Sequence, residues 1–318
     1  MRGVRVHGVL LLLVLVMAFP IFTRQRTRPT DIQGTLIWDR DTTELVSIAY
    51  RSADREIEIT RRTQDGESFL WGWEVTSQPG APPSDTLRFP VGVLGSELVK
   101  VFAEFRVLRD FGRVEPERQA AFGLVEPSAA ITLGFADGTR VIAVGDSIYG
   151  GSDRYGSDLS TGSVFVLPAR LVGPLQTGSG ALRERQVHYF QASDVAYVRI
   201  QALGMEREME RAGGEPGAPE VWVSPDDRQR PDQTFANFME RVGQLAISGF
   251  ATQVGPESLE RIMRIEYSGE DAEPLGFVEL FRHVESGVYF LSSERTRVAA
   301  TAVKLLAERV EQELPQIF

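Results

Sequence analysis

The chain has 318 residues, of which 42% are hydrophobic and 25% are charged, a composition typical of a folded globular protein with one large core or two ordinary ones. Its formal net charge of −10 argues against a nucleic-acid partner, because binding to a phosphate backbone depends on clustered Lys and Arg. The absence of cysteine excludes disulfide frameworks, thiolate metal sites and cysteine nucleophiles.

Residues 1–30 predict a membrane anchor or signal segment with its linker. An apolar run at residues 9–22 has arginines on both sides. It is shorter than the roughly 17 to 25 residues that usually span a bilayer, and its length fits a signal peptide. The small-residue cleavage site at Ala18 would cut the run in half, so we expect an uncleaved single-pass anchor, with a cleaved signal as the alternative. The flanking charges weakly favour a body outside the cytoplasm, in the periplasm.

Beyond residue 31, the same order of patterns occurs twice. Residues 45–50 and 195–200 alternate like half-buried strands, and a tryptophan-containing strand follows each of them. We pair Trp73 in the first half with Trp222 in the second. The order indicates an internal repeat.

A helix is predicted next in each half from apolar residues spaced by three and four. In the first half these residues are Leu94, Leu98, Val101, Phe102, Phe105 and Leu108. In the second half they are Phe235, Phe238, Val242 and Leu245. Ser96 and Thr234 are the expected N-caps.

Further paired segments follow these helices. Residues 131–138 pair with 262–269, each a strand ending in a tight glycine turn, and residues 164–167 pair with 288–291. A second helix is expected to close each half, a short one at 168–175 and a long one from about Ser293 to Leu314.

These patterns predict an α+β fold with two tandem copies of an antiparallel-sheet-plus-helix module after an N-terminal membrane helix. Short strands joined by tight turns pair in antiparallel fashion, and a helix covers one face of such a sheet. We expect the first module at residues 31–178 and the second at 179–318, with Gln176 to Gly180 as the linker.

The sequence Gly-Asp-Ser at residues 145–147 matches the motif that contains the nucleophile of GDS-type serine esterases. Such a hydrolase needs a histidine base, an acid that orients it and donors for the oxyanion. The single asparagine, Asn237, lies in a predicted helix, and none of the three histidines follows an aspartate by three residues. We therefore predict no catalytic residue and read Ser147 as the end of a strand, with a serine esterase as a remote alternative.

The segment from Gly145 to Gly162 is rich in Gly and Ser and carries Asp146, Asp153 and Asp158. The spacing of these aspartates does not match a calcium-binding loop, and the chain has neither a zinc-binding His-Glu-x-x-His motif nor a nucleotide-binding Gly-rich motif with Lys. We predict a solvated hairpin loop, with no metal site and no cofactor.

Two further groups of residues favour a structural role over a binding role. Three tryptophans in alternating strands are expected to belong to the core: Trp71, Trp73 and Trp222. Three glutamates that alternate along one strand are expected to face solvent: Glu206, Glu208 and Glu210.

Residues 122–146 together with 151–175 resemble the core of the domain-of-unknown-function family DUF4340. The matching positions are the aromatic-Gly-Leu triplet, a proline, two turn glycines, a tyrosine and the strand before a short helix: Phe122, Gly123, Leu124, Pro127, Gly138, Gly145, Tyr155 and Val164 to Leu167. The resemblance covers residues 45–175, and the second half only as an echo. It implies an N-terminal anchor, no established catalytic residues, and association with an ABC-type exporter and a gliding-motility-type auxiliary subunit.

We therefore expect a membrane-anchored, non-enzymatic accessory protein of an ABC-type transporter or envelope assembly, whose extracytoplasmic modules contact the permease, the ATPase or the auxiliary subunit. The alternative is an extracytoplasmic binding module for an envelope polymer or a small ligand, using the segment from Gly145 to Gly162 and the aromatic strands.

Overall fold

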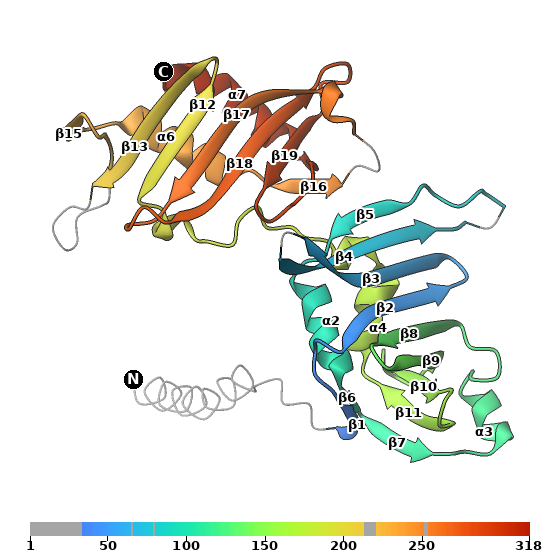
Figure 1. Ribbon diagram of the computed structural model, residues 1–318. Helices are drawn as coiled ribbons and strands as arrows, with labels where there is room; N and C mark the ends of the chain where they lie inside the picture. Colours follow the sequence, from blue (N-terminus) through green and yellow to red (C-terminus); the bar gives the residue numbers. More distant parts are fainter. Residues whose placement is uncertain (1–33, 65, 79, 213–220, 251–253) are drawn as a thin grey trace, which may run out of the picture.

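The computed structural model describes residues 34–64, 66–78, 80–212, 221–250 and 254–318 (Figure 1). The apolar run predicted as an anchor lies outside these residues. Within the part that is described, no helix is long and apolar enough to cross a bilayer.

The first module is built on a nine-stranded antiparallel sheet (Figure 1). Strand β8 alternates between buried and more exposed residues, the pattern expected where one face is covered, whereas β9 and β11 each have four consecutive buried residues and are buried on both faces. In order across the sheet, the strands are β5 (Leu87–Pro90), β4 (Glu67–Thr76), β3 (Arg55–Gln64), β2 (Leu45–Ser52), β8 (Ala129–Phe135), β9 (Gly138–Ser147), β10 (Arg154–Asp158), β11 (Ser163–Leu167) and β7 (Arg109–Gly112).

The second module repeats this order, position by position, in another nine-stranded antiparallel sheet. Its strands are β15 (Asp227–Pro231), β14 (Val221–Ser224), β13 (Met205–Ala212), β12 (Tyr197–Ala202), β17 (Leu259–Ser268), β18 (Pro274–His283), β19 (Tyr289–Ser293), β20 (Ala300–Ala302) and β16 (Ile247–Phe250). The prediction of antiparallel sheets combined with helices is therefore confirmed.

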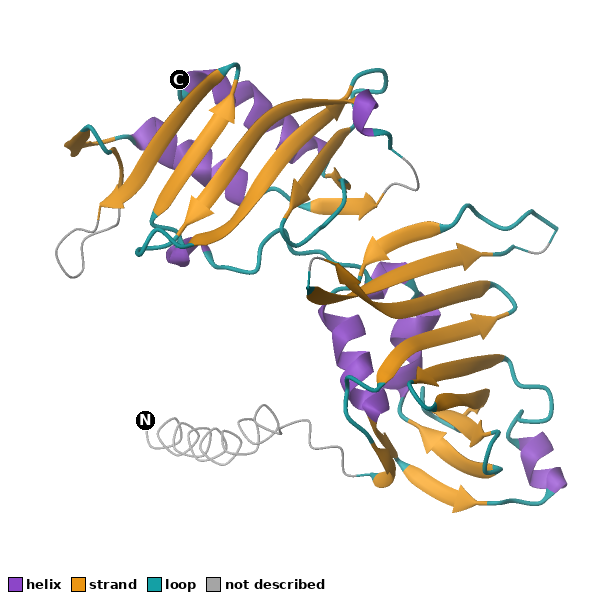
Figure 2. Ribbon diagram, in the orientation of Figure 1, coloured by secondary structure: helices purple, strands orange, loops and turns teal. Residues whose placement is uncertain are grey.

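Helices lie on one face of each sheet (Figure 2). In the first module they are α2 (Val93–Ala103), α4 (Ala169–Thr177) and α5 (Ser179–Leu182). In the second they are α6 (Gln233–Gly243) and α7 (Lys304–Glu313). The small helix α3 (Pro116–Ala121) lies apart from this layer, and β1 (Thr35–Asp39) pairs with β6 (Glu104–Val107) below α2.

The strand register shows which residues occupy the same place in the two sheets. In the first sheet, Ile48 of β2 is the cross-strand partner of Ile59 in β3 and of Leu133 in β8. In the second sheet, Val198 of β12 is the cross-strand partner of Met209 in β13 and of Tyr267 in β17. All six side chains are buried. Equivalent positions of the two sheets thus contribute to the main hydrophobic core, a single cluster that contains residues of both modules.

The pairing of Trp73 with Trp222 is wrong by three residues. Trp222 pairs with Arg211, the counterpart of Arg61, and Arg61 pairs with Leu70. Trp222 is buried against Phe235 of α6, on the helix-covered side of its sheet. Trp73 lies one position from Gly72, which pairs with the core residue Ile59, so Trp73 points to the opposite face. Because side chains alternate along a strand, an error of an odd number of residues exchanges the two faces.

The pairing of residues 164–167 with 288–291 is also wrong, by one strand. Residues 164–167 belong to β11, whose counterpart in strand order is β20, whereas residues 289–291 begin β19, the counterpart of β10. The short, alanine-containing strand β20 has too weak an apolar pattern to be recognised.

The predicted helices are correct in place but not in length. Helix α2 ends at Ala103, so Phe105 lies in β6 and Leu108 follows that strand. The predicted caps are wrong, because α2 begins after Gly92 and the cap of α6 is Asp232, which accepts a hydrogen bond from the backbone N–H of Phe235. In the second module, α7 begins only at Lys304. Sheet pairing at Ala300–Ala302 replaces the first half of the predicted long helix.

The predicted linker from Gln176 to Gly180 is wrong, since these residues form the end of α4 and the start of α5. A buried ion pair on the sheet holds them there. Glu74 pairs with Arg55 and accepts a hydrogen bond from the backbone N–H of Ser179, while Arg55 donates to the carbonyl of Thr177. The extended connection to the second sheet is the later stretch from Arg183 to Ala196.

Candidate functional site

The stretch from Arg183 to Ala196, which we call the connector, begins as an extension of the first module. Arg183 forms a β-bridge with Val91, and the backbone N–H of Glu184 donates to the carbonyl of Pro90. Gly92 allows this close approach, because a Cβ atom there would lie 2.8 Å from the carbonyl oxygen of Arg183. The connector is therefore attached along the edge of the first sheet.

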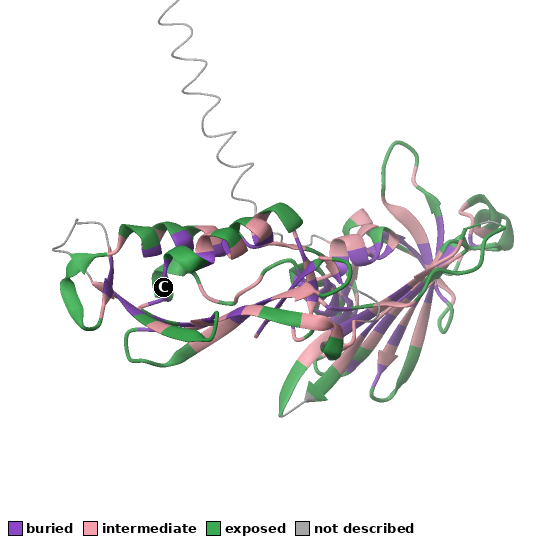
Figure 3. Cartoon of the chain, turned by 90° about the horizontal axis from the view of Figure 1, so that it is seen from above, coloured by how far each residue is buried: buried purple, intermediate pink, exposed green. Residues whose placement is uncertain are grey.

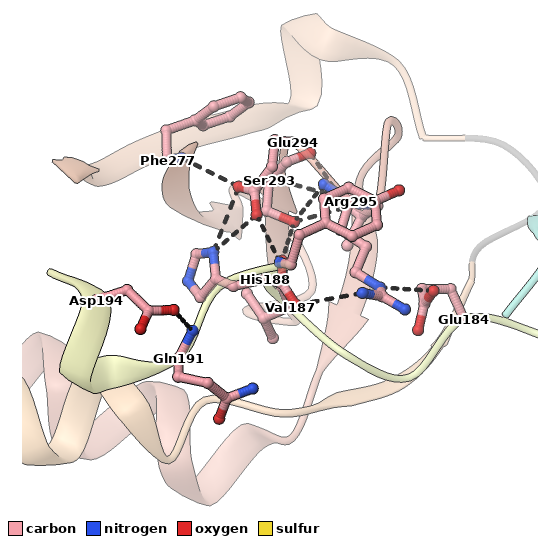
Figure 4. A network of polar contacts seen from close by, with 11 residues as sticks. Glu184, Val187, His188, Gln191, Asp194, Phe277, Ser293, Glu294 and Arg295 are labelled. Carbon is pink, nitrogen blue, oxygen red and sulfur yellow. Dashed lines mark hydrogen bonds and ion pairs between the residues drawn. The ribbon is translucent and has the colours of Figure 1, made fainter. Parts of the chain in front are cut away.

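Further along, Glu294 of the second module holds the connector (Figure 4). Its carboxylate lies 3.2 Å from Nδ1 of His188 and accepts hydrogen bonds from the backbone N–H groups of Tyr189 and Phe277. Gly276 makes room for it, since a Cβ atom there would approach the carboxylate to 2.5 Å. One carboxylate thus joins the connector to strand β18.

Ser293 makes the next contact with the connector, donating a 2.6 Å hydrogen bond to the carbonyl of Val187 (Figure 4). It is buried together with Thr296, whose hydroxyl accepts a hydrogen bond from the backbone N–H of Ser293. Both buried hydroxyls are thereby satisfied, as burial requires.

A buried ion pair completes the network. Nε of Arg295 lies 2.7 Å from Oε2 of Glu184, and both side chains are nearly inaccessible. The guanidinium of Arg295 also lies over the ring of Tyr189, 4.4 Å from its centroid. Removing one partner of such a pair would leave a buried charge uncompensated, so the two residues depend on each other.

One side of the connector lines a cavity of about 570 Å³ between α6 and the second sheet. The walls are rich in aromatic rings, including His188, Phe190, Trp222 and Tyr267. Burial, followed by the nearby Glu294 carboxylate, raises the pKa of Tyr267 well above its usual range, so this phenol stays neutral. Aromatic walls with a few polar groups are typical of small-ligand sites.

Charged groups are also present in this cavity. Arg211 and Glu240 both line it, and the guanidinium of Arg211 lies 5.0 Å from the centroid of the Trp222 ring. A ligand here would meet flat apolar surfaces and a charge of either sign. The arrangement suits a small, partly aromatic or sugar-like molecule.

Ser147 is the exposed last residue of β9, opposite Arg154. Among the described residues, no hydrogen bond joins Ser147 to a histidine. His188 pairs with Glu294, and the ring of His283 accepts a hydrogen bond from the backbone N–H of Ser286. The structure therefore does not bring Ser147 together with a general base.

The segment from Gly145 to Gly162 is not the long loop that we predicted, because strand β10 occupies its centre. Asp146 is exposed, whereas Asp153 accepts a 2.8 Å hydrogen bond from the backbone N–H of Ala169 at the start of α4. Asp158 is buried and binds Arg140 and Ser160. Within the described ranges, no group of three or more His, Asp or Glu residues is placed to hold a metal ion.

The other predicted positions divide between core and surface. Trp71 and Trp222 are buried as predicted, whereas Trp73 is half-buried and its indole N–H donates to Glu58. Glu206 and Glu208 are exposed as predicted. Glu210 is not: it is buried and paired with Arg228.

Sequence reasoning missed the whole connector network. The stretch QVHYFQASD, residues 186–194, concentrates aromatic residues and one of the three histidines outside any predicted strand. That combination could have indicated that this stretch makes specific contacts. Its partners Ser293 to Thr296 were hidden because they were assigned to a helix.

We predict that Asp158→Asn destabilises the protein at neutral pH. Burial raises the pKa of Asp158, but hydrogen bonds from Ser160 and the charge of Arg140 outweigh it, so that the pKa lies below its ordinary value. A carboxylate with a lowered pKa stabilises the fold above its unfolded pKa of about 3.9, and this stabilisation is lost as the pH falls through the folded value.

The variant should lower the free energy of unfolding by about 1–3 kcal/mol at pH 7. The difference from wild type should shrink below about pH 4. Urea unfolding across this pH range measures both, with the exposed Asp146→Asn as the control. A difference that does not depend on pH would contradict the assignment.

We also predict that Glu294→Ala releases the connector. Two backbone N–H groups and a histidine ring would lose their charged partner, and hydrogen bonds to charged groups are worth about 1.5–3 kcal/mol each. Amide hydrogen exchange at residues 188–191 should accelerate by about tenfold or more, as measured by mass spectrometry. The exposed Glu285→Ala is the matched control, and equal protection in the two variants would refute the role of Glu294.

Comparison with known proteins gives one match. Residues 97–262, more than half of the chain, match the family described as Domain of unknown function (DUF4340). The matched range starts in α2, includes the connector and ends in β17, so it extends further along the chain than the range of our predicted resemblance. No curated protein and no solved structure matches the chain. The chain belongs to the DUF4340 family.

Proposed function

We propose that the chain is a membrane-anchored, non-enzymatic accessory protein of an ABC-type transporter assembly. It consists of two tandem copies of one sheet-and-helix module behind an N-terminal membrane helix, and it acts through protein–protein contacts of these modules. The common strand order of the two sheets supports the duplication. Family resemblance supplies the transporter context.

The outer face of the second sheet is the observation that carries this proposal. No helix in the described part of the chain covers it (Figure 3). Side chains of opposite charge form a ladder of ion pairs across its neighbouring strands. Arg199 pairs with Glu208 at 2.7 Å, and Arg264 pairs with both Glu266 and Glu279. A flat surface with both signs of charge offers electrostatic complementarity to another protein, which gives specificity and register.

We predict that the full chain captures an ABC permease and its ATPase from native membranes in mild detergent, identified by mass spectrometry. Arg199→Glu should reduce their recovery by about tenfold or more, since reversing a central charge creates repulsion at the contact. Deleting residues 1–22 should also reduce recovery, because the chain would leave the membrane.

The control is Arg170→Glu, an exposed position on α4. It makes the same change of charge on the helix-covered side of the other module and should leave recovery unchanged. Recovery of no transporter component with the wild-type chain would refute the proposal. Equal losses with the two variants would refute the role of the charged face.

A ligand-binding module is the second candidate function, and the aromatic cavity beside the connector favours it. We expect small aromatic or sugar-like fragments to bind the full chain, as detected by saturation-transfer NMR. Ala236→Leu, which narrows the cavity, should abolish the signals, whereas Ala121→Leu on the exposed helix α3 should preserve them. Signals that survive Ala236→Leu would place binding elsewhere.

A further inference from the structure

A second cavity, of about 360 Å³, is lined by residues of both modules and by Glu184 and Tyr189 of the connector. Both modules contribute cationic side chains to it. Arg61 of β3 and Lys100 of α2 come from the first module, and Arg295 and Arg297 from the turn between β19 and β20. We call this cavity the cationic cleft.

The lining of the cleft is strongly positive although the protein is acidic. Four cationic side chains line it, and Glu184 is the one acidic side chain among the described residues of its lining. Lys100 is one of only two lysines in the chain. Glu184 is engaged with Arg295, so its charge does not neutralise the other three cations.

The remaining cations have weak acidic partners or none. Lys100 pairs with Glu97 and Arg297 pairs with Glu67, and both glutamates are more than half exposed. Exposed pairs of this kind contribute about 0–1 kcal/mol, so an incoming anion can replace them at little cost.

Arg61 forms no ion pair among the described residues. One of its terminal amino groups donates to the carbonyl of Thr42, while its Nε atom is buried without a hydrogen-bond partner in the described part of the chain. Nearly all buried donors are satisfied in folded proteins. Like the Nε atoms of Arg55, Arg183 and Arg295, that of Arg61 is a buried donor without a hydrogen-bond partner in the described residues, but only Arg61 and Arg295 of these line the cleft, where an anion could accept from them.

Aromatic rings orient two of the arginines. Arg297 lies over the ring of Phe69, 4.3 Å from its centroid, and Arg295 lies over Tyr189. Stacking fixes the plane of a guanidinium and so prepares its donor fork for a planar or tetrahedral oxyanion. The cleft is thus positioned for binding before any ligand arrives.

From this arrangement we propose that the cationic cleft binds a phosphate group. Arginine forks and a lysine ammonium are the side chains that recognise phosphate, and its multiple oxygens and charge suit cations converging from two modules. The bound group would connect Arg61 and Lys100 to Arg297 and hold the two modules together. This site is independent of the proposed function in transport.

Titration calorimetry on the full chain, in non-ionic detergent and phosphate-free buffer at low salt, tests this assignment. Inorganic phosphate and pyrophosphate are the probes, and we expect pyrophosphate to bind more tightly because it carries more charge. Arg61→Gln should weaken binding at least tenfold. Lys100→Gln, at an exposed position where folding is not at risk, should weaken it several-fold.

Arg88→Gln is the matched control, since it removes one positive charge from an exposed position of β5 outside the cleft. It should change the affinity by less than twofold. Short-chain phosphatidylglycerol, used below its micelle concentration, distinguishes a lipid headgroup from a soluble phosphate. Binding of either that depends on Arg61 and Lys100 supports the site and identifies the source.

Two outcomes would overturn the proposal. One is the failure of all three probes to bind the wild-type chain at millimolar concentration. The other is binding that Arg61→Gln and Lys100→Gln change no more than Arg88→Gln does, which would show a general effect of charge. Neither outcome bears on transporter capture, so the two proposals can fail separately.

Discussion

The helices that lie on one face of each nine-stranded sheet decide which face carries the main hydrophobic core. Only the first sheet buries part of its other face as well, in a smaller cluster that includes Ala143 and Val164 among the described residues. In the first module, α2 and α4 cover Ile48, Ile59 and Leu133, and the equivalent positions of the second module are covered by α6 and α7. The opposite face of the second sheet has no helix of the described residues packed against it. Its charged side chains pair with one another across neighbouring strands, which explains the ladder of ion pairs there. Core and outer surface are two results of one constraint.

The connector joins the two modules. The edge strands β5 and β16 lie near each other at the junction, and edge strands carry unpaired backbone groups. Part of the β5 edge is occupied by the connector through the bridge between Val91 and Arg183. Two carboxylates then hold the connector: the buried Glu184 pairs with Arg295, and the partly buried Glu294 accepts hydrogen bonds from backbone N–H groups. The position of the connector between the two modules is therefore fixed by hydrogen bonds and ion pairs, which require a particular geometry.

The sequence was sufficient to predict antiparallel sheets, the places of the principal helices and an internal repeat, because apolar periodicity is a local property. It was not sufficient to align the strands of the two copies residue by residue. Pairing Trp73 with Trp222 gives an alignment that places them on the same face, and only the cross-strand pairing of the structure corrects it. The connector network was beyond local reasoning. Ser293 and Val187 are 106 positions apart, and only the fold brings them together. Residues 293–303 fit a helical pattern in the sequence, but Ala300–Ala302 pair as a strand of the sheet and the helix begins only after them.

The two cavities are physically linked through the connector. His188 lines the aromatic cavity and the next residue, Tyr189, lines the cationic cleft, so adjacent side chains face different sites. Glu294 holds both residues, through the ring of His188 and the backbone N–H of Tyr189. If both cavities bind ligands, a movement of the connector backbone at either site would act on the hydrogen bonds of this one carboxylate, and the connector would be the element through which the two sites could be coupled.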